Sequence, residues 1–199
     1  MPQKSGKYKL LDLHDSVYEV YCHFDKDGAW SLVQSFSYAN GSLATKFSQF
    51  RKPLSQSAPV GENDPTWSGY RLSKPRMQSI KEDALHLRFT CDHNMKTLTV
   101  EKSDYLQMRL EDVGEDVLEI NGYSSIIPIR RGKIGGMKLN ACSLYLYQYH
   151  SISLCVTGYL YTCGILQYPS HLIVTLGRII HFLVITMLLS HVLRQPIGV

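Results

Sequence analysis

The sequence lacks the short motifs that identify many enzymes and metalloproteins. It has neither the Gly-x-Ser-x-Gly elbow of serine hydrolases nor the His-Glu-x-x-His helix of zinc proteases. Its five cysteines form no Cys-x-x-Cys pair, and no histidine spacing completes a zinc site with them. We therefore expect a protein that is not an enzyme and that holds neither a metal ion nor a cofactor.

Strong charge of either sign is also absent. The net charge is +4 over 199 residues, and the only short basic run is Arg130-Arg131-Gly132-Lys133. Nucleic-acid-binding domains carry clustered lysine and arginine, so no nucleic-acid partner is expected. Residues 1–16 contain no apolar run of signal-peptide length. Either the protein is cytosolic, or the chain lacks its true start.

The first 154 residues carry the pattern of β-strands. Apolar and polar side chains alternate in short stretches, and turn residues such as Asn121-Gly122 separate them. One amphipathic helix is predicted over 73–82, because Ser73 can cap it and Met77 and Ile80 share a face. We expect an α+β, β-dominated antiparallel domain, with strands over 8–13, 18–24, 30–36, 84–91, 96–100, 105–110, 117–120, 125–129 and 143–149.

The stretch YCHFDKDGAWSLVQ, residues 21–34, predicts a hairpin. A calcium loop would need oxygen ligands at alternating positions and a Glu near its end, but here the two Asp are followed by apolar residues. The flanks alternate as two strands, and Asp-Gly is a favoured turn centre. Trp30 is expected in the core, packed beside Tyr18 or Leu32.

Three other stretches contain reactive residue types without the required arrangement. His14-Asp15-Ser16 holds the residue types of a catalytic triad, but strand neighbours point to opposite faces. The acidic run 111–116 reads as a solvated turn between strands. In 132–136 the lysine precedes the glycine pair, so a hairpin loop is favoured over a phosphate-binding loop.

The composition changes after Leu154. Residues 155–199 contain no Asp, Glu or Lys, and the stretch 171–193 holds 15 strongly apolar side chains among 23 residues. At a rise of about 1.5 Å per residue, a helix of this length spans a bilayer. We therefore predict a separate tail over 155–199 with a candidate transmembrane helix at 171–193; the alternatives are packing within the protein and an erroneous extension of the coding sequence.

The entry of the chain resembles a fibrinogen C-terminal-like domain, as found in divergent invertebrate members. That family opens with Gly-x-Tyr, a Val-Tyr-Cys strand and an Asp-Gly-Gly-Gly-Trp turn. This chain has Gly6-Lys7-Tyr8, then Tyr18-Glu19-Val20-Tyr21-Cys22, then Asp27-Gly28-Ala29-Trp30. The segment Trp67-Ser68-Gly69-Tyr70-Arg71-Leu72-Ser73 also looks like that of divergent members. The resemblance implies a β-rich recognition domain over 1–154.

The chain departs from the family in ways that limit what the resemblance implies. The cysteine that pairs with the family's counterpart of Cys22 precedes Gly-x-Tyr, and this chain starts too late to contain it. The family's calcium loop and ligand pocket have no counterpart after Gly69. Scattered cysteines suit disulfides or buried thiols; we predict a disulfide between Cys91 and Cys142. Asn40-Gly41-Ser42 is a sequon, so Asn40 is a candidate glycosylation site.

Together these observations predict an extracellular or cell-surface recognition domain that binds a protein or glycan ligand, tethered to a membrane if residues 171–193 span it. One alternative is a membrane-associated structural protein without a ligand of its own. Another is a hydrolase built on a β scaffold. Neither the ligand nor the oligomeric state follows from the sequence.

Overall fold

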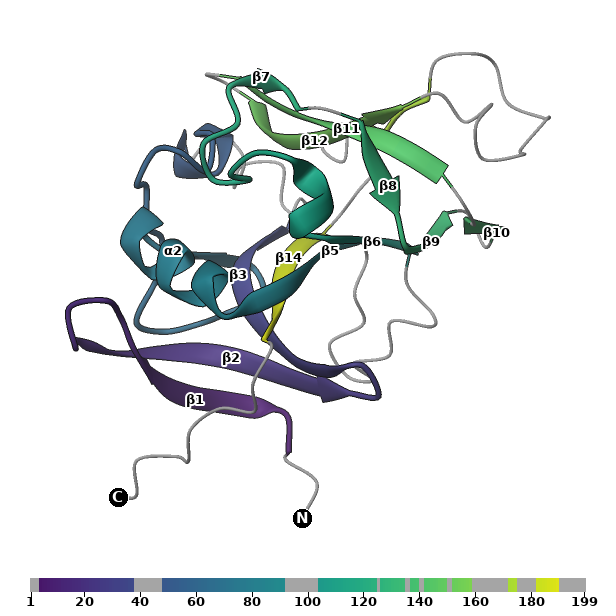
Figure 1. The fold of residues 1–199 in the computed structure, drawn as a ribbon. Coiled ribbons are helices and arrows are strands. Elements are labelled where there is room, and N and C mark those ends of the chain that lie inside the picture. The colour runs from purple at the N-terminus through teal and green to yellow at the C-terminus, as the bar shows by residue number, and fades with distance from the viewer. Residues whose placement is uncertain are drawn as a thin grey trace.

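The computed structural model describes residues 4–37, 48–91, 104–124, 126–134, 137–139, 142–149, 152–158, 172–174 and 182–189. Within these ranges the chain forms two antiparallel β-sheets, one α-helix and two short 3-10 helices (Figure 1). The prediction of a β-dominated α+β fold with antiparallel strands is therefore confirmed.

The larger sheet contains nine strands. Eight of them follow the order β1-β2-β3-β14-β5-β6-β9-β10, and the ninth, β4, pairs with β3. Every pairing is antiparallel. The strands are β1 (Gly6–Leu11), β2 (Val17–Asp25), β3 (Gly28–Ser37), β4 (Gly69–Arg71), β5 (Ala84–Cys91), β6 (Asp104–Arg109), β9 (Arg131–Ile134), β10 (Met137–Leu139) and β14 (Phe182–Leu189).

The smaller sheet lies at the end of the molecule opposite to β1 and β2 (Figure 1). It follows the order β13-β12-β11-β7, and β8 also pairs with β11. Its strands are β7 (Gly122–Tyr123), β8 (Ile127–Ile129), β11 (Cys142–Tyr149), β12 (Ile152–Gly158) and β13 (Leu172–Val174). The strand predicted at 143–149 is therefore present as β11.

The one α-helix of the described ranges, α2 (Lys74–Glu82), occupies the predicted position and contacts β5 and β14. Met77 and Ile80 are buried, as their spacing on one helix face requires. Pro75 stands in the first turn, where no backbone N–H is needed. Ser73 is the N-cap residue, but its side chain makes no capping hydrogen bond.

The strand predicted at 117–120 is wrong, because these residues form a turn. The side chain of Asp116 accepts a hydrogen bond of 2.9 Å from the N–H of Leu118, and its backbone carbonyl accepts one of 2.8 Å from the N–H of Glu119. Such local bonds stabilise a turn in place of a strand. The apolar residues Val117 and Ile120 are nevertheless buried in the main apolar cluster, which explains the misleading pattern.

The predicted helix over 171–193 is also wrong where the structure describes it, because residues 172–174 and 182–189 are strands. An apolar run alone does not separate a buried strand from a buried helix. Strand β14 lies between β3 and β5, and both neighbours pair with it almost along its whole length. A short apolar run is as consistent with a strand inside a sheet as with a helix. Within the described residues, no helix is long and apolar enough to cross a membrane.

Candidate functional site

The β2–β3 turn closes as the hairpin that the sequence predicts. Asp25 pairs with Gly28 across the turn, and its Oδ1 atom accepts a hydrogen bond of 2.8 Å from the N–H of Asp27. Gly28 has a φ of 131°, a conformation that residues with a Cβ rarely adopt. The turn therefore holds the carboxylate of Asp25 in a defined position.

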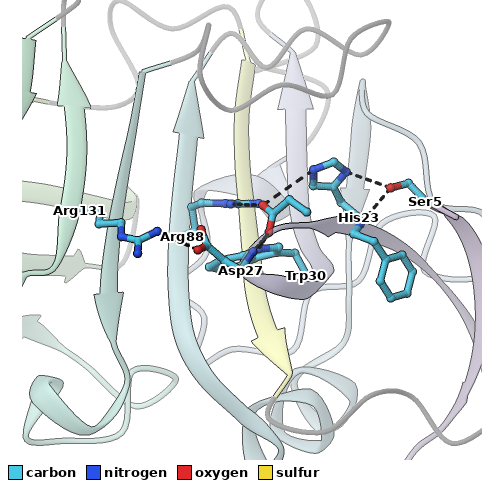
Figure 2. Close-up of polar contacts among 8 residues, drawn as sticks. Ser5, His23, Asp27, Trp30, Arg88 and Arg131 are labelled. Carbon is cyan, nitrogen blue, oxygen red and sulfur yellow. Dashed lines mark hydrogen bonds and ion pairs between the residues drawn. The ribbon is translucent and has the colours of Figure 1, made fainter. Parts of the chain in front are cut away.

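This partly buried carboxylate belongs to a polar cluster with Arg88, Trp30 and His23, which Figure 2 labels. Nη1 of Arg88 donates a hydrogen bond of 2.9 Å to Oδ2 of Asp25, and Nε1 of Trp30 donates one of 3.0 Å to Oδ1. The guanidinium carbon lies 3.7 Å from the centroid of the Trp30 ring, which is a cation–π contact. Arg88 is only 3% exposed and Trp30 is fully buried. One carboxylate and one ring thus offset the charge of a buried guanidinium.

Strand β14 lies between the two strands that carry Trp30 and Arg88, and so it sets how far apart β3 and β5 are. Thr186 of β14 pairs with Leu32 of β3 on one side and with Arg88 of β5 on the other. Arg88 therefore starts two strands away from β3, and its long side chain reaches the turn that follows β2. Figure 2 shows β14 as the yellow strand beside the cluster.

Ser5 and His23 extend the cluster to the edge of the sheet. The pair Gly6–Cys22 aligns β1 with β2, so Ser5 comes to lie beside His23. Oγ of Ser5 lies 3.2 Å from Nδ1 of His23 and accepts a hydrogen bond of 3.0 Å from the N–H of Phe24 (Figure 2). Nε2 of His23 lies 4.0 Å from Oδ2 of Asp25. His23 is buried at 8% exposure.

Burial and charge together set the protonation states in the cluster. Burial is the main cause that lowers the pKa of His23, and Arg88 adds to the effect while Asp25 opposes it. Burial raises the pKa of Asp25, but the hydrogen bond and charge of Arg88, together with the hydrogen bonds from the N–H of Asp27 and from Trp30, outweigh it and lower the pKa below its usual value. At neutral pH the cluster therefore contains one carboxylate, one guanidinium and a neutral imidazole.

An exposed ion pair connects the same turn to β9. Nη1 of Arg131 donates a hydrogen bond of 2.8 Å to Oδ1 of Asp27 (Figure 2). The side chain of Arg131 is 55% exposed, so water screens this attraction. The pair helps to orient the turn but adds little to the free energy of unfolding.

Ser5, His23 and Asp25 have the residue types of a hydrolase triad, but their contacts are those of a structural anchor. At 4.0 Å the His23 and Asp25 atoms are too far apart for a hydrogen bond. Both oxygens of Asp25 already accept hydrogen bonds, from Arg88, Trp30 and the turn backbone. A triad instead needs a carboxylate bonded to the imidazole. In the part of the chain that the structure describes, no group of His, Cys, Asp or Glu side chains could hold a metal ion.

The residues singled out in the sequence fall in different places. Trp30, Tyr18 and Leu32 are all buried; Tyr18 and Leu32 belong to the main apolar cluster, whereas Trp30 faces Arg88. Cys91 ends β5 and Cys142 begins β11, and their side chains lie outside the described part of the structure, so the disulfide stays a prediction. Asn40 lies outside the described residues.

The sequence contains a weak signal for the polar cluster, which the alternation of apolar residues does not reveal. His23 and Asp25 are two residues apart in a strand and therefore share one face. Arg88 lies between Leu87 and Phe89 in an alternating stretch, a pattern that is typical of a strand with one solvated face. The pattern gives no sign that this face is also covered, and a buried arginine needs a partner that is distant in sequence.

Comparisons with known proteins add no family to these observations. The sequence matches no protein-family model, and no curated protein is significantly similar to it. The likeness to fibrinogen-like domains therefore rests on the residues quoted above.

Proposed function

We propose that this chain is an extracellular recognition domain of fibrinogen-like type, which binds a protein or glycan ligand and catalyses no reaction. One observation carries the proposal. The stretch that resembles the family's entry forms the three consecutive antiparallel strands β1, β2 and β3, and Trp30 stacks on Arg88 and donates a hydrogen bond to Asp25. The residues that carry the resemblance are thus scaffold residues, as expected of a motif that defines a fold.

The contacts of the polar cluster support binding over catalysis. The hydroxyl of Ser5 is bonded to the backbone of Phe24, and the carboxylate of Asp25 is bonded to Arg88 and Trp30. Groups engaged in this way stabilise the sheet and are poorly placed to attack a substrate. The exposed rim, which includes Lys26 and Arg131, is where a ligand would meet this end of the sheet.

A binding screen tests the proposal. The full chain is required, because ending it at Leu154 removes β14 from the middle of the large sheet. We expect saturable binding to at least one class on arrays of immobilised glycans and extracellular proteins. The variant Trp30→Ala, whose scaffold is disrupted, serves as the control and should lose that binding. No saturable signal from the folded wild-type chain on either array would contradict the proposal.

The glycosylation site and the disulfide that go with this proposal have their own test. Produced with an added secretion leader, the chain should shift in mobility when N-glycans are removed, and Asn40→Gln should abolish the shift. Peptide mapping without reduction should recover Cys91 linked to Cys142. Recovery of Cys91 linked to Cys22 would contradict the disulfide, and Cys22 is a free, buried thiol in this structure.

A helical membrane anchor is no part of the proposal. Residues 182–189 would supply the centre of such an anchor, but they form β14. Their backbone groups pair with β3 and β5.

One observation favours a second candidate, a hydrolase that uses Ser5. Its Oγ atom is within 3.2 Å of Nδ1 of His23, a contact from which an imidazole can accept the hydroxyl proton. A fluorophosphonate probe and a p-nitrophenyl acetate assay decide between the two candidates. If the probe labels Ser5, and Ser5→Ala removes both the label and the hydrolysis, the hydrolase is correct. If the wild-type chain does neither, the candidate is wrong.

A further inference from the structure

The edge strand β1 is joined to the large sheet through β2, its partner in the sheet order. At the start of β1, Ser5 connects the strand to two groups of β2. Its Oγ atom accepts a hydrogen bond from the N–H of Phe24 and lies 3.2 Å from Nδ1 of His23. The position of His23 therefore influences how the beginning of β1 is held.

The groups around His23 come from three strands and from the residue before β1 (Figure 2). Ser5 precedes β1, and Asp25 follows two residues later on β2, with its Oδ2 atom 4.0 Å from Nε2. Trp30 of β3 is the direct pairing partner of His23. Arg88 of β5 is bonded to Asp25 at 2.9 Å. Asp25 and Arg88 are the charged groups that act on His23.

We propose that His23 is a pH-sensitive latch, which holds the start of β1 on the sheet while neutral and releases it when protonated. In the neutral imidazole with its hydrogen on Nε2, Nδ1 accepts a hydrogen bond from the hydroxyl of Ser5. In the imidazolium, both ring nitrogens carry hydrogens, so Nδ1 becomes a donor. The hydroxyl hydrogen of Ser5 then loses its acceptor, and Oγ has to accept from Nδ1 as well as from the N–H of Phe24.

Charge balance acts in the same direction. With neutral His23, the charges of Asp25 and Arg88 cancel within the buried cluster. Protonation adds a second cation next to Arg88, and the two cations then compete for one carboxylate that already accepts other hydrogen bonds. A buried excess charge is costly, and moving His23 outward together with β1 relieves it.

The pH range follows from the direction of the shift. Burial and Arg88 lower the pKa of His23 in the folded chain below its ordinary value of about 6.5. The folded state therefore favours the neutral form. The stability that this provides is fully present above about pH 6.5, and it is lost as the pH falls through the pKa of the folded state.

Hydrogen exchange on the full chain tests the latch. The peptide that covers β1 should lose roughly ten-fold in protection between pH 7.5 and pH 5, after correction for intrinsic exchange, while the α2 peptide keeps its protection. The variant His23→Gln can still accept the Ser5 hydrogen bond but cannot become charged, so its β1 protection should not change with pH. Ser5→Ala should be less protected at both pH values.

Two results would overturn the latch. One is equal protection of β1 at both pH values in the wild-type chain. The other is a loss of β1 protection between pH 7.5 and pH 5 in His23→Gln that is as large as the loss in the wild-type chain. If His23→Gln does not fold, an NMR titration of the wild-type chain decides the question: the ring signal of His23 and the amide of Tyr8 in β1 must share one midpoint, and different midpoints would refute the proposal.

Discussion

Arg71 and Arg88 are both buried in the large sheet, but different kinds of partner bond to the terminal nitrogens of the two guanidinium groups. Arg71 of β4 is fully buried and donates four hydrogen bonds, all to backbone carbonyl groups of one connecting segment. The acceptors are the carbonyl groups of Gln49, Lys52, Pro53 and Gln56, at 2.7–3.0 Å. Arg88 instead bonds to the carboxylate of Asp25 and stacks on Trp30.

The two environments have different electrostatic consequences. Burial lowers the pKa of Arg71 to about 10, and no acidic group opposes the shift. Burial also lowers the pKa of Arg88, but the hydrogen bond and charge of Asp25 act against it. Arg71 is thus held by dipoles whose strength does not depend on pH, whereas Arg88 depends on a group that titrates.

The difference shows two uses of a buried arginine. Arg71 organises a loop, because its planar donors bond to four carbonyl groups of one segment at the same time. Arg88 joins two strands through a turn, because an ion pair needs only one acidic partner. Removing Arg71 should therefore disturb a whole segment, and removing a partner of Arg88 should leave one unbalanced charge.

The largest effect is expected for Arg71→Met. The variant keeps most of the aliphatic volume but removes four hydrogen bonds to backbone carbonyl groups, and only two of those carbonyls, of Gln49 and Pro53, keep a backbone N–H donor. The free energy of unfolding should therefore fall by about 5 kcal/mol. Urea unfolding of the variant and the wild type measures the change. The control Arg109→Met removes an exposed arginine and should cost less than about 1 kcal/mol. If the free energy of unfolding of Arg71→Met falls by less than about 2 kcal/mol, the segment 48–56 keeps its structure without the hydrogen bonds from Arg71.

Trp30→Ala is the next most severe change, on the side of Arg88. It removes a buried ring, the platform for the guanidinium and one hydrogen bond to Asp25, so we expect a loss of about 4 kcal/mol. Thermal unfolding followed by circular dichroism measures it. Trp30→Phe keeps an aromatic ring and should lose only about 1–2 kcal/mol. A variant Trp30→Ala that melts within a degree or two of the wild type would place the ring outside the core.

Asp25→Asn tests the difference between the two arginines most directly, because it should affect Arg88 and not Arg71. It leaves Arg88 without a counter-charge, so stability at pH 7 should fall by about 3 kcal/mol, while the contacts of Arg71 are unchanged. The folded state lowers the pKa of Asp25, so its contribution is present above the unfolded value of about 3.9 and is lost as the pH falls through the folded value.

Acid unfolding curves test this dependence on pH. The wild type and Arg71→Met should both show the loss of stability that comes from Asp25, and Asp25→Asn should lack it. An unchanged acid profile in Asp25→Asn would mean that the ion pair does not contribute to the pH dependence.

The smallest effect is expected for Arg131→Gln. The variant breaks the exposed ion pair between Arg131 and Asp27. The free energy of unfolding should therefore fall by less than about 1 kcal/mol. Raising the salt concentration should shrink the difference between variant and wild type further. A loss as large as that of Asp25→Asn would show that the outer pair is coupled to the buried one.

Local pattern was sufficient to predict the elements whose signals lie within a few residues. The hairpin around Asp25 and Gly28 and the helix after Ser73 were predicted because turn chemistry and one-sided periodicity are local properties. The turn at 117–120 was missed, because the side chain of Asp116 redirects the backbone while apolar residues preserve a strand-like pattern. The buried cluster was missed because Arg88 and Asp25 are 63 residues apart.

The sequence by itself determined the β-dominated class of this protein, since alternating apolar residues and Asp-Gly turns admit few other structures. It also determined which residues of the first hairpin are apolar enough to be buried. Only the tertiary structure decided that residues 182–189 are a strand, because the unpaired edges of β3 and β5 supply the backbone partners that an apolar segment needs. By lying between those strands, β14 also set the distance at which Arg88 meets Asp25, and no local pattern contains that distance.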